Sequence, residues 1–263
     1  MTLAAYLRPP DLTWRTIRVW QRNWRVFVKT FRVNFLPPLL EPLLYLLSLG
    51  YGLGLFVSQI DGISYPRFIA PALLAVSIMN AGFFETTYSS YVRMYFQKTF
   101  DAIIATPLSI EEVITGEILW GATRSFINAS IMLPVLIAFG VVDLPISFVI
   151  IPFSFLAGFL FASIGMCFTA LTPNIETLNI PTFLFITPMF LFSGTFFPLS
   201  ILPMPIQNFA TAVLPLTHVV KITRMITLSQ VTPEILVSLA WIVIVAAVLF
   251  VLAVNLMKRR LIV

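Results

Sequence analysis

The stretch EILVSLAWIVIVAAVLFVLAVNLM, residues 234–257, decides the fold class of this chain. It carries one charged residue, Glu234 at its first position, and is otherwise almost entirely apolar. A helix needs ~20 apolar residues to cross ~30 Å of hydrocarbon, and this stretch exceeds that length. Lys258, Arg259 and Arg260 follow it directly. The stretch therefore predicts a membrane-spanning helix with a basic flank.

The rest of the chain has the same character. Hydrophobic residues make up 59% of the 263 residues, and charged residues only 10%. Soluble domains have about 45–50% apolar and about 25% charged residues, so a soluble fold would leave much of its surface apolar. Five more stretches are long and apolar enough to span a bilayer, roughly at 36–57, 66–92, 114–140, 147–171 and 178–197. The sequence predicts an all-α integral membrane protein with six transmembrane helices.

The distribution of lysine and arginine predicts the orientation. Twelve of these residues fall on one side of the six spans. Seven are in the leader, three follow the sixth span, and Arg93 and Lys98 are in the loop after the second span. Arg67, Lys221 and Arg224 fall on the other side. Because cytoplasmic segments carry the excess of Lys and Arg, we expect a bacterial inner-membrane protein with both termini cytoplasmic. The formal charge of +5 does not indicate nucleic acid, because the basic residues cluster at the two termini rather than along one face.

Residues 12–33 are predicted to form one amphipathic helix. Its basic residues recur every three or four positions and share one stripe: Arg15, Arg18, Arg22, Arg25, Lys29 and Arg32. An apolar stripe follows the same spacing on the opposite side, with Val19 and Val26 off the pattern: Ile17, Trp20, Trp24, Phe27 and Phe31. A basic face opposite a Trp/Phe face is typical of a helix that lies in the membrane interface. We therefore divide the chain into a cytoplasmic amphipathic leader, 1–33, and a membrane domain, 34–263.

The segment 198–233, before the last span, is apolar but interrupted. Pro198, Pro203, Pro205 and Pro215 each remove a backbone donor, which disfavours a continuous span. Short helical pieces that re-enter the outer leaflet and pack against protein are the expectation.

Enzyme chemistry finds little support in the residue inventory. His218 is the one histidine and Cys167 the one cysteine, so we expect no metal-ligand set and no catalytic triad. No G-x-x-x-x-G-K-[ST] motif occurs, so no nucleotide phosphate is cradled in the usual way. A membrane-embedded lipid-modifying enzyme would need clustered carboxylates or histidines at the interface. A passive channel is disfavoured because no polar ring repeats through the spans.

Two intramembrane charges stand out, because such groups are costly and usually paired. Glu85 in the second predicted span and Arg124 in the third both fall about 10–15 Å from the cytoplasmic edge at 1.5 Å per residue. We predict a buried ion pair, and leave open whether it is structural or lines a path. Aromatic side chains near it could line a path for sugar, because their faces contact carbohydrate C–H groups. The candidates are Phe84, Tyr88 and Tyr91.

Five motifs, in order along essentially the whole chain, give it a family resemblance. They are EPLLYLLSLGYGLG (41–54), FETTYSSYVRM (84–94), QKTFDAIIATPLSIEEVITGEILW (97–120), TPMFLFSGTFFPLSILP (187–203) and LPLTH (214–218). The chain resembles the permease subunits of ABC-2-type exporters, and most closely their nodulation-type lipo-oligosaccharide permeases.

The resemblance implies a half-channel that forms a homodimer and works with a separate ATPase, which binds the ATP and Mg. It implies that the leader lies beside that ATPase, and that 97–112 is a coupling helix with Pro107 and Leu108 at its turn. Apolar residues of this segment are then expected to fill a groove on the ATPase: Phe100, Ile103 and Ile104. Its acidic residues would meet basic groups there: Asp101, Glu111 and Glu112.

The leading hypothesis is therefore an exporter permease for a lipid-linked or amphiphilic oligosaccharide or glycolipid, with no ATPase site of its own. The alternative within transport is a drug or antibiotic efflux permease of the same superfamily.

Overall fold

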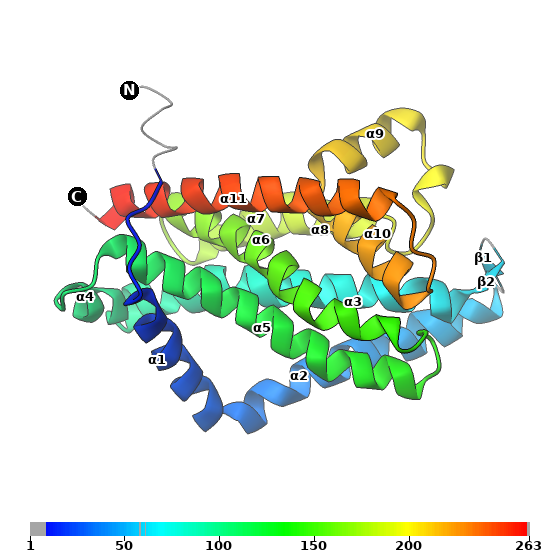
Figure 1. Ribbon diagram of the computed structural model, residues 1–263, viewed down its shortest axis with the longest axis horizontal. Helices are drawn as coiled ribbons and strands as arrows, with labels where there is room; N and C mark the ends of the chain where they lie inside the picture. Colours follow the sequence, from blue (N-terminus) through cyan, green and yellow to red (C-terminus); the bar gives the residue numbers. More distant parts are fainter. Residues whose placement is uncertain (1–8, 58, 61, 262–263) are drawn as a thin grey trace.

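Long helices lying side by side form the body of the protein (Figure 1). The computed structural model describes residues 9–57, 59–60 and 62–261, and within them four continuous helices are long and apolar enough to cross a membrane. They are Tyr65–Phe96, Ile110–Ala138, Ile146–Leu171 and Glu234–Leu261. Each of these helices covers one of the predicted spans, at 66–92, 114–140, 147–171 and 234–257.

The described chain is helical almost throughout. Its α-helices are α1 (Thr16–Lys29), α2 (Phe31–Tyr45), α3 (Tyr65–Phe84), α4 (Thr99–Ile104), α5 (Ile110–Ala138), α6 (Ile150–Leu171), α7 (Asn179–Pro181), α8 (Thr187–Phe192), α9 (Met204–Val213), α10 (Pro215–Thr227) and α11 (Glu234–Leu261). Wider π turns lie at Leu46–Gly52, Glu85–Ser89, Val92–Phe96 and Thr182–Ile186. Tighter 3₁₀ turns lie at Leu53–Leu55, Ile146–Val149, Glu176–Leu178 and Leu199–Ile201. Two short strands, β1 (Gln59–Ile60) and β2 (Ile63–Ser64), pair antiparallel, with Gln59 opposite Ser64.

The helix α6 lies at the centre of the bundle and packs against α3, α5 and α11. Small residues allow this close approach. A Cβ at Gly158 would lie 2.3 Å from the Cβ of Ser125, and one at Gly165 would lie 2.4 Å from the Oγ1 of Thr86. Glycine at these positions lets the backbones approach as they do between transmembrane helices.

The leader helix α1 packs on α5 rather than lying apart from the bundle. A Cβ at Gly116 of α5 would lie 2.6 Å from the Cβ of Val19, so this glycine sets the depth at which α1 docks. Val19 and Phe27 are buried. Val19, which the stripe analysis set aside as off the pattern, is therefore a packing residue. Residues 1–8 of the predicted leader, including Arg8, lie outside the described residues.

Each of the two predicted stripes of the leader has some side chains packed against the bundle and others exposed. Trp20 donates its indole N–H to Thr123 Oγ1 over 2.8 Å and stacks on Trp24 at 5.7 Å. Apolar side chains of the stripe remain exposed at Ile17, Trp24 and Phe31. Arg18 and Arg25 are also exposed, whereas Arg22 is half-buried.

Two predicted spans correspond to shorter helical segments. The stretch predicted at 36–57 overlaps α2 and contains the apolar helical segment Leu43–Leu55, and the one predicted at 178–197 overlaps the segment Glu176–Phe192. The second ends early because Gly194 adopts a positive φ of 74° and Pro198 follows it. By length and composition, the described residues therefore contain four helices that could span a membrane, or five if the bent pair described next is one span.

The interrupted segment before the last span folds as two helices. The helices α9 and α10 are bent by 89° at Leu214, as in a broken span or a re-entrant loop. Pro215 begins α10, where its missing N–H costs little. Stacking of His218 on Trp241, with ring centroids 4.4 Å apart, ties α10 to α11.

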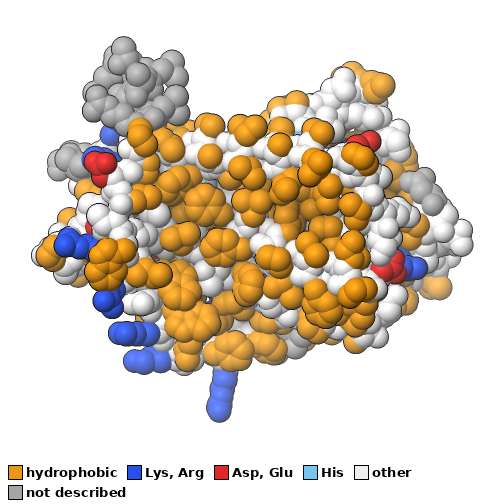
Figure 2. Space-filling model, viewed as in Figure 1, with side chains coloured by type: hydrophobic (Ala, Val, Ile, Leu, Met, Phe, Trp, Pro, Cys, Tyr) orange, Lys and Arg blue, Asp and Glu red, His pale blue; other side chains and the backbone are white. Residues whose placement is uncertain are grey.

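The two ends of the bundle differ in charge. The ends of the described chain, α1 and α4 lie at one end, and β1, β2 and α9 lie at the other (Figure 1). Figure 2 shows hydrophobic side chains across the middle of this face, with Lys and Arg gathered near the end that carries α1 and α4. We call this the α4 end.

Candidate functional site: a basic cavity at the α4 end

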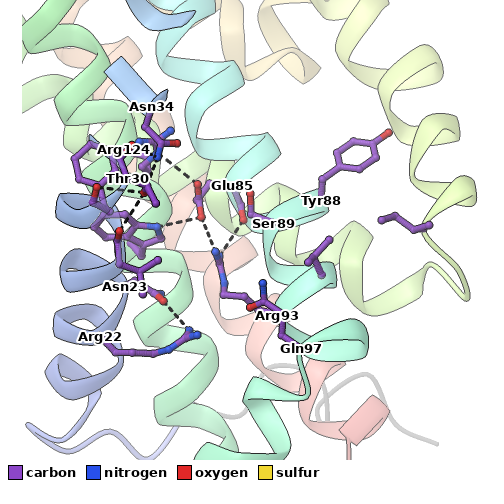
Figure 3. A pocket seen from close by; sticks show the side chains of 15 residues that line it. Arg22, Asn23, Thr30, Asn34, Glu85, Tyr88, Ser89, Arg93, Gln97 and Arg124 are labelled. Carbon is purple, nitrogen blue, oxygen red and sulfur yellow. Dashed lines mark hydrogen bonds and ion pairs between the residues drawn. The ribbon is translucent and has the colours of Figure 1, made fainter. Parts of the chain in front are cut away.

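A polar cavity of about 450 Å³ opens at the α4 end, between the leader and the bundle (Figure 3). Three regions supply most of its lining: α1 with the start of α2, the last turns of the helix 65–96, and α5. The charged and polar lining residues are Arg22, Asn23, Thr30, Asn34, Glu85, Tyr88, Ser89, Arg93, Gln97 and Arg124. Apolar lining comes from Val26, Phe27, Val92, Trp120 and Ile175.

Glu85 joins the elements that form the cavity. Its Oε1 accepts a hydrogen bond from Arg93 Nη1 at 2.8 Å and from the indole N–H of Trp120 at 3.0 Å. Its Oε2 lies 3.4 Å from Arg124 Nε. The side chains of Glu85, Arg93 and Arg124 are only 12–15% exposed. At this depth each charge depends on its partners, because little water reaches it.

Glu117, behind the cavity wall, completes the network. Its side chain is 0% exposed and its Oε2 lies 2.6 Å from Arg93 Nη2. Asn23 donates to Glu117 Oε1 at 2.8 Å, and the hydroxyl of Ser90 donates to Glu117 Oε2 at 2.7 Å. A buried carboxylate is stable only when its oxygens are satisfied in this way. Glu117 therefore joins the leader, the helix 65–96 and α5.

Arg22 projects from α1 into the same cavity (Figure 3). It donates to Asn23 Oδ1 at 2.9 Å and to Thr99 Oγ1 at 3.3 Å. Burial lowers the pKa of its guanidinium from the usual value, Glu117 raises it, and Arg93 lowers it further. Arginine stays protonated in proteins, so Arg22 remains a cation.

The predicted pair of Glu85 and Arg124 is therefore part of a larger set. The two side chains are within ion-pair distance, but the shorter contact of Glu85 is with Arg93. The assignment of Arg93 to a loop was wrong, because the helix continues through two π turns to Phe96. Sequence reasoning missed Glu117. The rule that intramembrane charges are costly and paired applied to it equally, since it falls in the stretch 114–140.

The three aromatic path candidates have different surroundings. Tyr88 lines the cavity and donates its hydroxyl to Asn179 Oδ1 at 2.8 Å. Phe84 lines a second, mainly apolar cavity. Tyr91 is buried, stacks on Tyr95 at 4.6 Å and donates to the carbonyl of Pro173 at 2.8 Å. Tyr91 is therefore not part of the basic cavity's lining, and a role of these aromatic residues in a substrate path stays a prediction.

The predicted coupling segment forms a turn at the same end. The short helix α4 follows Lys98, whose φ of 51° reverses the chain direction. Pro107 and Leu108 lie between α4 and α5, and the carbonyl of Pro107 accepts from Arg15 Nη1 at 2.9 Å. The coupling role itself stays a prediction.

Phe100 cannot fill a groove on a partner in this structure, contrary to expectation, because it is 0% exposed. It packs in a core cluster with Val113, Ile114 and Ile118, and Ile103 and Ile104 pack against that cluster. Exposed positions of the segment include Asp101, Ala102, Ala105, Thr106 and Pro107, which we call the α4 tip.

Glu111 and Glu112, expected to meet a partner, are also buried. Glu111 pairs with Lys258 at the end of α11. Glu112 forms a capping box with Ser109 and accepts a hydrogen bond from Thr13. The capping box of Glu112 satisfies free N–H groups at the start of α5. Because Glu111 is paired with Lys258, both carboxylates serve the protein's own fold.

The described residues include no group of three or more His, Cys, Asp or Glu side chains that could hold a metal ion. Long apolar helices beside a basic cavity define a multi-pass membrane protein with a polar site between its leader and its bundle.

Comparison with known proteins identifies the class. Residues 15–228 match the family model described as ABC-2 type transporter, and the chain belongs to this family. It is 35% identical over 252 residues to Nodulation protein J of Rhizobium meliloti (strain 1021), covering 96% of each chain. It is 34% identical over 257 residues to Nodulation protein J of Rhizobium leguminosarum bv. viciae, covering 98% of each. It is 24% identical over 195 residues to the inner membrane transport permease YadH of Escherichia coli (strain K12), covering 73% of this chain and 75% of that one. The chain is thus a multi-pass inner-membrane transport subunit.

Proposed function

We propose that this chain is the permease subunit of an ATP-driven exporter that moves an amphiphilic or lipid-linked oligosaccharide, or a glycolipid, out across the inner membrane. In this proposal the permease forms a homodimer, crosses the membrane six times and has both termini in the cytoplasm. A separate ABC ATPase subunit binds ATP and Mg and performs the hydrolysis.

The observation that carries the proposal is the grouping of three features at one end of the bundle. The leader helix, the α4 tip and the basic cavity all lie at the α4 end (Figure 1). Glu117 ties the leader to the wall of the cavity through Asn23 and Arg93. A force applied at the α4 end would therefore reach the groups that line the cavity.

The energy supply can be tested directly. The purified chain is expected to show no ATPase activity, and to copurify with an ABC ATPase when the two are coexpressed. When the chain and that ATPase are reconstituted together, the ATPase should hydrolyse ATP faster after glycolipids are added. Hydrolysis by the isolated chain would refute the permease assignment. Stimulation by drugs and not by glycolipids would favour an efflux permease instead.

The coupling surface needs a variant that leaves the core intact. Asp101→Lys combined with Ala105→Trp changes the exposed α4 tip and spares Phe100. The expected result is normal membrane insertion, with ATPase copurification and export both reduced at least tenfold. Glu176→Lys is the matched control, because Glu176 is an exposed acidic residue in another interhelical link. Normal export by the double variant would exclude the α4 tip as the coupling surface.

A further inference from the structure

The helix 65–96 contributes side chains to two cavities of different character. Val76, Asn80 and Phe84 line the apolar cavity of about 200 Å³, and Tyr88 and Val92 line the basic cavity. These five residues recur every four positions, as neighbours on a helix surface do. Phe84 from the apolar lining and Tyr88 from the basic lining are in contact, with ring centroids 5.9 Å apart.

The apolar cavity is suited to a hydrocarbon chain. Its lining is mainly aliphatic and aromatic, from Tyr45, Leu73, Val76, Met79, Phe84, Ile186 and Phe190, and Ser77, Asn80 and Thr187 add polar side chains. Apolar surface removed from water here would stabilise a bound tail by about 25 cal/mol per Å².

The basic cavity has more positive charge than its own carboxylates balance. Arg22, Arg93 and Arg124 line it, whereas Glu85 is the one carboxylate in the lining and Glu117 lies behind it. Among the described side chains, Arg22 has no carboxylate within ion-pair distance. The Nη1 atom of Arg124 is buried and has no hydrogen-bond partner among them. Planar guanidinium groups bind phosphate and carboxylate through paired N–H donors.

We propose that the two cavities form one site for an anionic amphiphile. The anionic head group, a phosphate or a chemically similar oxyanion, binds Arg22 and Arg124 in the basic cavity, and hydroxyls next to it bond to Asn34 and Gln97. The tail lies across Phe84 in the apolar cavity. This inference rests on the proposed function and narrows its substrate class to amphiphiles that carry a negative charge beside the sugar.

The test measures binding to the full-length permease alone, in nanodiscs of zwitterionic phosphatidylcholine, by isothermal titration. Three probes separate the parts of the ligand: octyl glucoside 6-phosphate has head and tail, octyl glucoside lacks the anion, and glucose 6-phosphate lacks the tail. The phosphorylated glucoside is expected to bind at least tenfold more tightly than either of the others. Equal affinity for octyl glucoside would overturn the anion site, and equal affinity for glucose 6-phosphate would overturn the tail site.

Variants locate the binding in these cavities. Arg22→Gln should weaken binding of octyl glucoside 6-phosphate about tenfold, and Arg22→Lys should keep most of the affinity. Arg32→Gln, which removes an exposed arginine of the same leader, should change it less than twofold. If Arg32→Gln lowered the affinity as much as Arg22→Gln, the probe would be attracted by the positive surface of the leader rather than bound in the cavity. Phe84→Ala should weaken binding of the tailed probe and leave glucose 6-phosphate unaffected.

Failure of this inference and failure of the proposed function are distinguishable. The titration uses the permease alone. If the phosphorylated glucoside binds selectively but no ABC ATPase copurifies with the chain, the proposed binding site stands and the exporter assignment is refuted. ATPase coupling and export without selective binding of the phosphorylated glucoside would keep the exporter and refute the site.

Discussion

The ion pairs at the two ends of the bundle differ in how much water they share. At the α4 end, the side chains of Glu85, Glu117, Arg93 and Arg124 are at most 15% exposed. At the opposite end, Arg67 pairs with Asp143, and these side chains are 39% and 36% exposed. Both sets join segments that are far apart in the chain. The difference indicates that the buried set holds helices together through charge, whereas the exposed pair supplements contacts that exist without it.

Burial decides how much each charge matters. An isolated charge in the interior would cost several kcal/mol, so the carboxylates and guanidinium groups at the α4 end stabilise the fold only as a set. Exposed pairs keep their hydration and contribute about 0–1 kcal/mol. If the α4 end also binds an anionic ligand, the carboxylates hold Arg93 and Arg124 in place, while Arg22 has no ion pair among the described residues.

The largest expected effect comes from Glu117. Glu117→Gln keeps the side-chain shape but leaves Arg93 with one carboxylate partner in the interior, which should lower the free energy of unfolding by about 3–5 kcal/mol. The measurement is the thermal unfolding midpoint of the detergent-solubilised protein, with the yield of monodisperse protein as a second readout. Glu176→Gln is the control, because that side chain is exposed. Equal midpoints for the two variants would mean that Glu117 is dispensable.

A double-mutant cycle on Glu85 and Arg124 should give the next largest effect. Glu85→Gln is expected to cost about 2–3 kcal/mol, because Glu85 accepts from a charged donor and lies beside a second arginine. Arg124→Gln should cost less, since Arg93 still neutralises Glu85. The double variant should regain part of the loss, with a coupling energy of about 1 kcal/mol. Strict additivity of the two unfolding free energies would show that the two side chains do not interact in the folded protein.

Much of the fold could be predicted from composition and period. Apolar stretches alone located the four long helices to within a few residues, because hydrocarbon thickness sets their length. Pro198, Pro203, Pro205 and Pro215 likewise predicted the break that the bend at Leu214 shows. The fifth predicted span was too long because apolar residues continue past Gly194, whose positive φ ends the helix. Hydropathy does not report backbone conformation.

The site was harder to predict, for two physical reasons. Which helix faces meet depends on packing across the bundle, so the contact of Arg93 with Glu117 has no local signal in the sequence. Burial of Phe100 depends on the same packing. Glu112 is different, because Ser109 three residues before it gives a capping-box pattern that is visible in the sequence. We assigned this carboxylate to a partner surface and missed that local signal.

A smaller effect is expected from a change in the contact between the leader helix α1 and α5 at the α4 end. Gly116→Ala places a methyl group against Val19, and the resulting overpacking should cost about 1–3 kcal/mol and shift α1 away from α5. Limited proteolysis of the leader should then be faster than in the unchanged protein. Gly52→Ala is the control, because a Cβ there would have only Leu47 O within contact distance, at 3.9 Å. Unchanged proteolysis would show that α1 is not held by this contact.

The smallest effect on stability is expected at the end of the bundle opposite the α4 end, where Arg67 pairs with Asp143. Arg67→Gln removes the ion pair with Asp143, and the loss should be below about 1 kcal/mol because both partners remain hydrated. The segment stays in place without the pair, since the backbone N–H of Asp143 donates to the carbonyl of Thr227 at 2.7 Å. Raising the salt concentration should shrink the difference between the variant and the unchanged protein, because screening weakens exposed pairs. The same increase should leave the penalty of Glu117→Gln nearly constant. A salt-independent penalty at Arg67 as large as that at Glu117 would show that this pair is shielded from water in the assembled transporter, and the contrast between the two ends would then fail.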